Sequence, residues 1–184
     1  MPVLLDSYAI DDYERELDVK NGVIKRGEKI ACHKGCSICC TIQEIPITTP
    51  EFLGISWYYS EICEPDIKKQ IRPRLLNHDK IIECPFLLDT VCSIYPVRPL
   101  ACRDFFVYGE PCKMNEDPFV ARPNDMHPPN REISMYVALR LLDFQGFNLS
   151  SMEEKEKAFN DGIIINSCRP MHSINWAKYV RMTE

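Results

Sequence analysis

The sequence lacks the motifs that identify the commonest enzyme classes. It contains no phosphate-binding loop, no dinucleotide-binding fingerprint, no His-Glu-x-x-His metalloprotease motif and no nucleophile elbow. It also contains no internal repeat and no low-complexity tract. The common motif-bearing enzyme classes and the repeat architectures are therefore excluded, and no catalytic residue can be assigned from a motif.

An excess of positive charge and a long apolar run are also missing. The 184 residues carry 22 Lys and Arg against 27 Asp and Glu, a net charge of −5, which gives no reason to expect nucleic acid or an acidic membrane as a partner. No apolar run approaches the ~18 residues needed to span a bilayer. The first residues lack the basic segment and apolar stretch of a signal peptide. We therefore expect a cytoplasmic protein whose partner is another protein or a small molecule.

Cysteine, in contrast, is abundant, with ten in the chain. Thiols stay reduced in the cytoplasm, so a dense cysteine pattern there indicates metal ligation or redox chemistry more than disulfides. Eight cysteines fall into two groups, within residues 32–40 and 84–112. Such groups of thiolates are typical of zinc and iron–sulfur sites, and we predict zinc or an iron–sulfur cluster as the cofactor. The predicted metal ligands are Cys32, Cys36, Cys39, Cys40, Cys84, Cys92 and Cys102, with Cys112 as a further candidate.

The neighbours of these cysteines suggest additional roles. Cys39 and Cys40 are adjacent, and adjacent side chains of an extended segment point to opposite sides. We therefore expect one of the two to serve a second ion or to be a reactive thiol. Arg98 and Arg103 flank Cys102 and could donate to its thiolate, although ordinary salt bridges are an equal alternative.

The two remaining cysteines have simpler explanations. Cys63 follows an aromatic segment and is expected to be a small buried apolar residue. Cys168 and His172 could form a nucleophile–base pair or a ligand pair, but structural packing is favoured. We expect His127 at the surface or in a loop.

Apolar periodicity and capping residues predict a mostly helical chain. Helices are expected over residues 6–20, 49–63, 65–76, 130–144, 151–161 and 175–182, with a break or bend at Pro73. Short strands are expected over residues 41–47 and 163–165. Eight of the fourteen prolines fall in residues 83–129, which predicts turn-rich structure that bound metal would organise.

These elements indicate one irregular α+β domain, mostly α, over residues 1–184. Its Cys-cluster core spans residues 30–112, and residues 113–184 form a C-terminal helical extension. A metal-organised, Pro- and Cys-rich loop region lies between the helices.

Several short motifs occur in a characteristic order. They are Cys36-x-x-Cys39-Cys40, Cys84-Pro85-Phe86-Leu87, Cys92-Ser93-Ile94-Tyr95, Arg98-Pro99 and Cys102-Arg103-Asp104-Phe105. Over residues 30–112 the chain thereby resembles the CxxCxxCC cysteine-cluster proteins, also called the YkgJ family, although three residues separate Cys32 from Cys36 where the family has two. The resemblance implies chelation of zinc or iron. The family also includes a domain similar to flagellin lysine methylases.

The leading hypothesis is therefore a metal-binding protein. The alternative is an enzyme, either a metallo-oxidoreductase or a cluster-dependent protein-modifying enzyme, for example methyltransferase-like, that uses an open metal position. Cys32-x-x-x-Cys36-x-x-Cys39 also satisfies the radical-SAM pattern, but the repeated βα units of that fold are missing. A thiol–disulfide exchanger is weaker still, since the βαβ context of its motif is absent.

Overall fold

The computed structural model describes residues 1–42 and 44–183, and most of them are helical. The α-helices are α1 (Pro2–Arg26), α2 (Ile38–Ile42), α3 (Thr49–Trp57), α4 (Pro65–Leu76), α5 (Leu100–Arg103), α6 (Pro118–Ala121), α7 (Arg131–Leu141), α8 (Met152–Asn160), α9 (Ile163–Ser167) and α10 (Trp176–Met182). The shorter turns are η1 (Tyr58–Ile62), which is π-helical, and the 3-10 turns η2 (His78–Lys80), η3 (Tyr95–Val97), η4 (Pro123–Asp125), η5 (Leu142–Phe144) and η6 (Met171–Ser173). The predicted mostly α, α+β single domain is confirmed.

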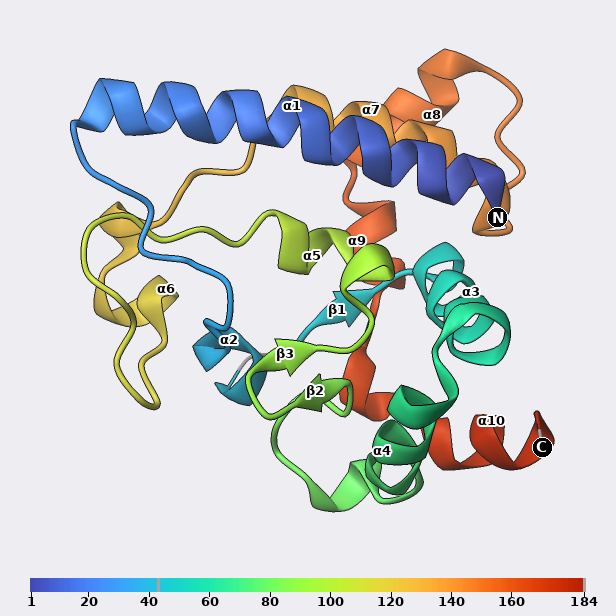
Figure 1. Ribbon diagram of the computed structural model, residues 1–184. Coiled ribbons are helices and arrows are strands. Elements are labelled where there is room, and N and C mark those ends of the chain that lie inside the picture. The colour runs from blue at the N-terminus through green and yellow to red at the C-terminus, as the bar shows by residue number, and fades with distance from the viewer. Residues whose placement is uncertain (43, 184) are drawn as a thin grey trace.

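Two groups of helices enclose a centre of short strands. The long α1 lies along one side of the molecule with α7 and α8 behind it, and α3, α4 and α10 gather on the other side (Figure 1). Between them β1 (Pro46–Ile47) pairs antiparallel with β4 (Arg169–Pro170), with Ile47 opposite Arg169. The hairpin of β2 (Leu87–Leu88) and β3 (Val91–Cys92) turns through Asp89, whose φ is 54°. None of the described helices is both long and apolar enough to cross a membrane.

The first helix is longer than its sequence pattern predicts. Helix α1 does not stop at Asn21-Gly22; it ends at Gly27, which adopts a left-handed conformation with φ 69°. Gly22 has a different role, since a Cβ there would lie 2.0 Å from the Tyr108 hydroxyl oxygen. The glycine therefore allows Tyr108 to pack directly against the helix backbone.

The predicted start of α3 is confirmed, and it also fixes a neighbouring element. Thr48 caps the helix, and the Glu51 carboxylate accepts hydrogen bonds from the Thr48 backbone N–H and hydroxyl, both at 2.7 Å. The other Glu51 oxygen accepts the Leu100 N–H at 2.7 Å, at the start of α5. Burial raises the pKa of Glu51, although these donors act in the opposite direction. The capping box therefore ties α3 to the helix that carries Cys102.

Pro73 neither ends α4 nor separates its last turn. The helix runs through to Leu76, and Asn77 N–H donates to the Pro73 carbonyl at 3.2 Å. Ile71 and Leu75 are fully buried on one face, so tertiary packing holds the helix around the missing N–H of the proline.

Both predicted strands are largely wrong. Residues 41–42 end α2, where the Thr41 hydroxyl donates to Ile38 O at 2.8 Å, and only Pro46–Ile47 are extended; residue 43 lies outside the described residues. Residues 163–165 begin α9, whose turn is closed by a 3.0 Å bond from Asn166 N–H to Gly162 O. The strand partner of β1 comes from Arg169–Pro170 instead.

The main apolar core is aromatic at its centre and joins distant parts of the chain. Trp176 is 1% exposed and packs edge-on against Phe86, with 4.9 Å between ring centroids. Its Nε1–H donates to Met171 O at 2.9 Å, which satisfies the one polar atom of the ring. The C-terminal residues thereby fix the loop that follows Cys84.

Candidate metal centre

One cavity of about 180 Å³ brings the two cysteine groups together. The cysteines that line it are Cys32, Cys36, Cys39, Cys40, Cys84, Cys92, Cys102 and Cys112. These are the eight cysteines singled out by their spacing, and all ten cysteines of the chain are free thiols. Their role as ligands stays a prediction, but their convergence on one cavity is a property of the fold.

Backbone hydrogen bonds hold the segments around this cavity. Cys84 N–H donates to Cys40 O at 2.7 Å, which joins the two cysteine groups directly. Ala31 N–H donates to Val107 O at 2.7 Å and Gly109 N–H to Lys29 O at 2.8 Å, so the segments before and after the cavity run side by side. A small number of backbone hydrogen bonds between these segments therefore position the loops.

Cys39 and Cys40 lie in helix α2, not in an extended segment. Successive side chains of a helix are about 100° apart, so adjacent thiols can face the same cavity. Both line it, and a hydrogen bond between the two thiols, together with burial, raises the pKa of Cys39. The expectation that they must point to opposite sides is wrong, because the local conformation is helical.

The thiols of three cysteines of the second group, Cys84, Cys92 and Cys102, are deeply buried. Burial raises the pKa of Cys84 to about 12 and also raises the pKa values of Cys92 and Cys102. The Cys84 thiol lies 3.7 Å from the Met171 sulfur. Met171 also lines the cavity, and nothing in its sequence context indicates this.

Electrostatic coupling connects the two cysteine groups through Cys39. A thiolate at Cys39 would raise the pKa values of Cys84, Cys92 and Cys102. It would also raise the pKa of Cys32, which burial, Cys36, Cys39 and Cys112 together bring to about 11. Without a cation, burial and these charges favour the protonated thiol at Cys32, Cys84, Cys92 and Cys102.

The donor chemistry of this cavity fits zinc or iron–sulfur iron, both of which bind thiolates. Within residues 1–42 and 44–183, no group of three or more His, Cys, Asp or Glu side chains is already arranged to hold a metal ion. The thiols would therefore have to turn inwards and lose their protons when metal binds.

The two arginines beside Cys102 differ in role. Arg103 is 2% exposed and donates to Asp12 at 2.5 Å and to the carbonyls of Arg98 and Pro96 at 2.9 and 2.8 Å. It is a structural residue, as the salt-bridge alternative anticipated. Arg98 lines the cavity and stacks on Tyr95, with 3.9 Å from its guanidinium carbon to the ring centroid.

Other candidate residues lie outside this cavity or have fixed partners. Cys63 is buried in the main apolar core, as expected. Cys168 lines a separate cavity of about 350 Å³, and its thiol donates to Ile164 O at 3.4 Å, whereas His172 Nε2 bonds to Glu83 O at 3.0 Å. The two side chains therefore have separate structural partners.

His127 lies in a loop, as one of the two expectations has it, but it is not at the surface. It is 6% exposed, and its ring nitrogens bond to the Tyr108 hydroxyl at 2.6 Å and to Asp18 at 3.0 Å. These contacts connect the loop that follows the cysteine region to α1. The sequence reasoning missed this network because its members are far apart in the chain.

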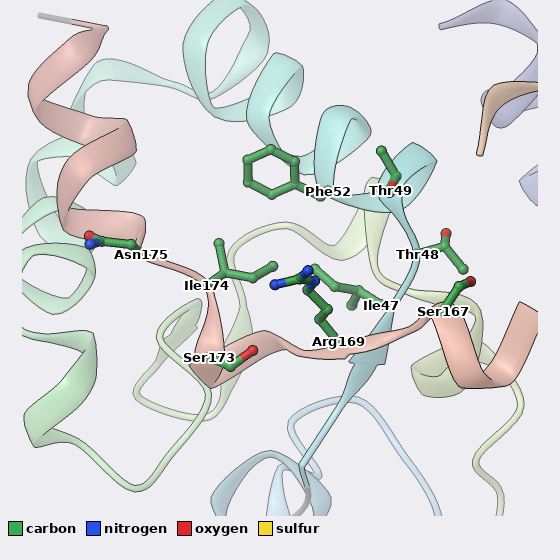
Figure 2. Close-up of a pocket in the computed structure, with 9 residues that line it drawn as sticks. All are labelled: Ile47, Thr48, Thr49, Phe52, Ser167, Arg169, Ser173, Ile174 and Asn175. Atoms are coloured by element: carbon green, nitrogen blue, oxygen red, sulfur yellow. The ribbon is translucent and has the colours of Figure 1, made fainter. Parts of the chain in front are cut away.

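A further cavity of about 400 Å³ contains no cysteine and lies beside the β1–β4 pair. Figure 2 shows Arg169 extending into it between Ile47 and Ile174, with Phe52 across the opening. The thiol chemistry is therefore concentrated at the cysteine-lined cavity.

Comparison with known proteins agrees with this geometry. The model of the CxxCxxCC family, described as a "putative zinc- or iron-chelating domain", matches residues 31–124, just over half of the chain. Neither the curated proteins nor the solved structures contain a significant match. All eight cavity cysteines fall inside the matched segment. The chain therefore belongs to the CxxCxxCC family, and this membership supports metal binding as its general function.

Proposed function

We propose that the cysteine-lined cavity binds zinc or an iron–sulfur cluster through Cys39, Cys84, Cys92 and Cys102. Cys32, Cys36, Cys40 and Cys112 are the adjoining thiols that complete this centre or hold a second ion. The observation that carries the proposal is the convergence of eight thiols, from two sequence-distant groups, on one cavity of about 180 Å³. Bound metal would offset the repulsion between neighbouring thiolates by their attraction to a cation.

The position of the four thiols in the fold supports this assignment. Cys39 lies on α2, Cys92 on β3 and Cys102 on α5, so each is held by a defined element. Cys84 is 8% exposed and is fixed by its backbone bond to Cys40. A thiolate site of this kind would link otherwise short elements into one unit.

The test is the metal content of protein purified without oxygen. Elemental analysis for zinc and iron, an assay for acid-labile sulfide and a visible spectrum distinguish a colourless zinc protein from a coloured cluster protein. We expect stoichiometric metal in the wild type and its loss in Cys102→Ser. Cys168→Ser is the matched control, because that thiol lies at another cavity and should leave the metal content unchanged.

If Cys102→Ser fails to fold, titration of the wild type with a chelator gives the same information. Metal-free wild-type protein that melts at the same temperature as the purified form would refute the proposal. Equal metal content in Cys102→Ser and Cys168→Ser would refute the ligand assignment alone.

A second candidate function is an enzyme that acts at the same centre. The cavity has four thiols more than one tetrahedral site requires, so a spare thiol or an open metal position is available for substrate. Metal spectroscopy that finds a non-protein or exchangeable ligand would favour the enzyme, whereas four protein thiolates would favour a closed structural site.

A further inference from the structure

A large groove runs along α1 and shares some of its lining residues with the cysteine-lined cavity. Its volume is about 810 Å³, and its apolar surface is provided by Val19, Val23, Ile24, Ile30, Tyr95 and Phe106. We call this surface the α1 groove. It is large enough for a ligand of metabolite size, and its apolar side chains favour a ligand with an apolar body.

The α1 groove carries a surplus of positive charge in an acidic protein. Five Lys and Arg residues line it against two acidic residues, although the whole chain has a net charge of −5. One of the acidic residues, Asp12, pairs with Arg103 at 2.5 Å and more distantly with Arg98 at 3.7 Å. The other, Glu16, is neutralised by Lys20 at 2.6 Å.

Two cationic groups therefore remain available to a ligand. Lys29 is exposed, and its ammonium group has no hydrogen bond or ion pair with any residue that the structure describes. Arg98 shares one carboxylate with Arg103, so its own charge is only partly balanced. Both line the groove, and an anion bound between its walls would complement them.

A buried arginine of the groove wall is already paired with carboxylates. Arg15 lines the α1 groove and is 2% exposed, and its Nη2 forms ion pairs with Asp11 at 3.2 Å and with Asp104. Its Nε and Nη1 are buried and closed off from the groove. The positive charge that the groove offers to a ligand therefore comes from Lys29 and Arg98.

The groove and the cysteine-lined cavity share part of their walls. Tyr95, Arg98 and Phe106 line both, so a ligand in the groove lies one side-chain layer away from the thiols. The Arg98 guanidinium stacks on the exposed Tyr95 ring, which gives this layer a cationic face.

We propose that the α1 groove binds a small organic anion, a carboxylate or a phosphate monoester attached to an apolar body. Lys29 and Arg98 would bind the anionic group, and the apolar side chains would cover the rest of the ligand. The proposal rests on the charge and shape of the groove and does not depend on which metal the cysteines bind.

Isothermal titration calorimetry with ligands of one chain length tests the proposal on the protein as purified. The probes are octanoate and octyl phosphate, with octylammonium and octanol as controls for the charge. We expect saturable binding of at least one anion, at least about tenfold tighter than either control, because charge-assisted bonds add to the shared apolar contact. The tighter of the two anions identifies the preferred acidic group.

Substitutions locate the binding. Lys29→Gln and Arg98→Gln should each weaken binding of the anion by about tenfold, and added salt should weaken this binding further. Arg169→Gln is the matched control, since it removes an exposed arginine from the other cavity (Figure 2) and should leave the affinity unchanged. Lys29 lies in an exposed loop, so its substitution should leave folding intact even if Arg98→Gln does not.

Three results would overturn the proposal: no anion binds, octylammonium binds as tightly as the anions, or Arg169→Gln weakens binding as much as Lys29→Gln. None of these results depends on the metal content. Failure here is therefore distinguishable from failure of the proposed metal centre.

Discussion

The helical side of the molecule and its cysteine-lined loops are stabilised by different means. The core beneath α3, α4 and α10 is made of fully buried apolar side chains such as Ile55, Ile71 and Trp176. The loops around the cavity consist of short elements joined by a few backbone bonds, and their shared feature is thiols. Apolar burial accounts for the first region, and Phe86, Ile94 and Val97 extend the same core into the second. The second region also has a thiol donor set whose additional stabilising partner would be a metal ion.

Removal of the metal should give the largest difference between the two regions. Structural zinc contributes on the order of 10 kcal/mol of apparent free energy in small metal-dependent domains, so the loops should lose most of their stability. Hydrogen exchange followed in chelated protein should show lost protection over residues 84–112 and retained protection in α1 and α7. Equal loss in both regions would show that they form one cooperative unit and would remove the contrast.

Trp176→Ala tests the apolar side. The ring is 1% exposed, packs against Phe86 at 4.9 Å and donates to Met171 O, so its removal should lower the free energy of unfolding by about 3–5 kcal/mol. Denaturant unfolding measures this, with Tyr95→Ala, an aromatic residue that is 60% exposed, as the small-effect control. A loss below that of Tyr95→Ala would contradict the assignment of Trp176 to the core.

Gly22→Ala examines the junction between the two regions. Alanine favours a helix, but its Cβ would lie 2.0 Å from the Tyr108 hydroxyl, so we expect a net destabilisation of about 1–2 kcal/mol. The matched test is Tyr108→Phe in the Gly22→Ala background, because it removes the clashing oxygen. Because Tyr108→Phe also removes the hydrogen bond to His127, the cost of Gly22→Ala is compared in the two backgrounds. If Gly22→Ala costs as much in the Tyr108→Phe background as in the wild type, the close approach of the Tyr108 hydroxyl does not explain the glycine.

Asp104→Asn should give the smallest and most condition-dependent effect. Burial, reinforced by the nearby Asp11 charge, raises the pKa of Asp104 from 3.8 to about 7. The folded state then binds more protons than the unfolded state, so this group makes stability fall as pH rises through that window. Asp104→Asn should flatten the decline, measured by urea unfolding across the window. Asp6→Asn, on the exposed face of α1, is the control and should leave the decline unchanged. If stability falls with pH at the same slope in Asp104→Asn and in the wild type, the raised pKa of Asp104 is contradicted.

Local sequence signals predicted the elements whose stability is local. The Thr48–Glu51 and Ser151–Glu154 capping boxes begin α3 and α8 where expected, since their bonds join residues three apart. The predictions that failed concern residues whose conformation depends on contacts with distant parts of the chain. Gly22 accommodates Tyr108 and does not end a helix, buried neighbours hold α4 together at Pro73, and β1 pairs with Arg169–Pro170 and not with residues 163–165.

The same division applies to the site. By itself, the sequence determined which eight cysteines have ligand spacing and assigned the chain to its family, because thiol chemistry and spacing are written in the residue order. Only the tertiary structure decided that the two cysteine groups line one cavity, that Cys39 and Cys40 both face it, and that a cationic groove adjoins it. These features depend on how distant segments pack, and packing is set by burial and by long-range hydrogen bonds that no local pattern encodes.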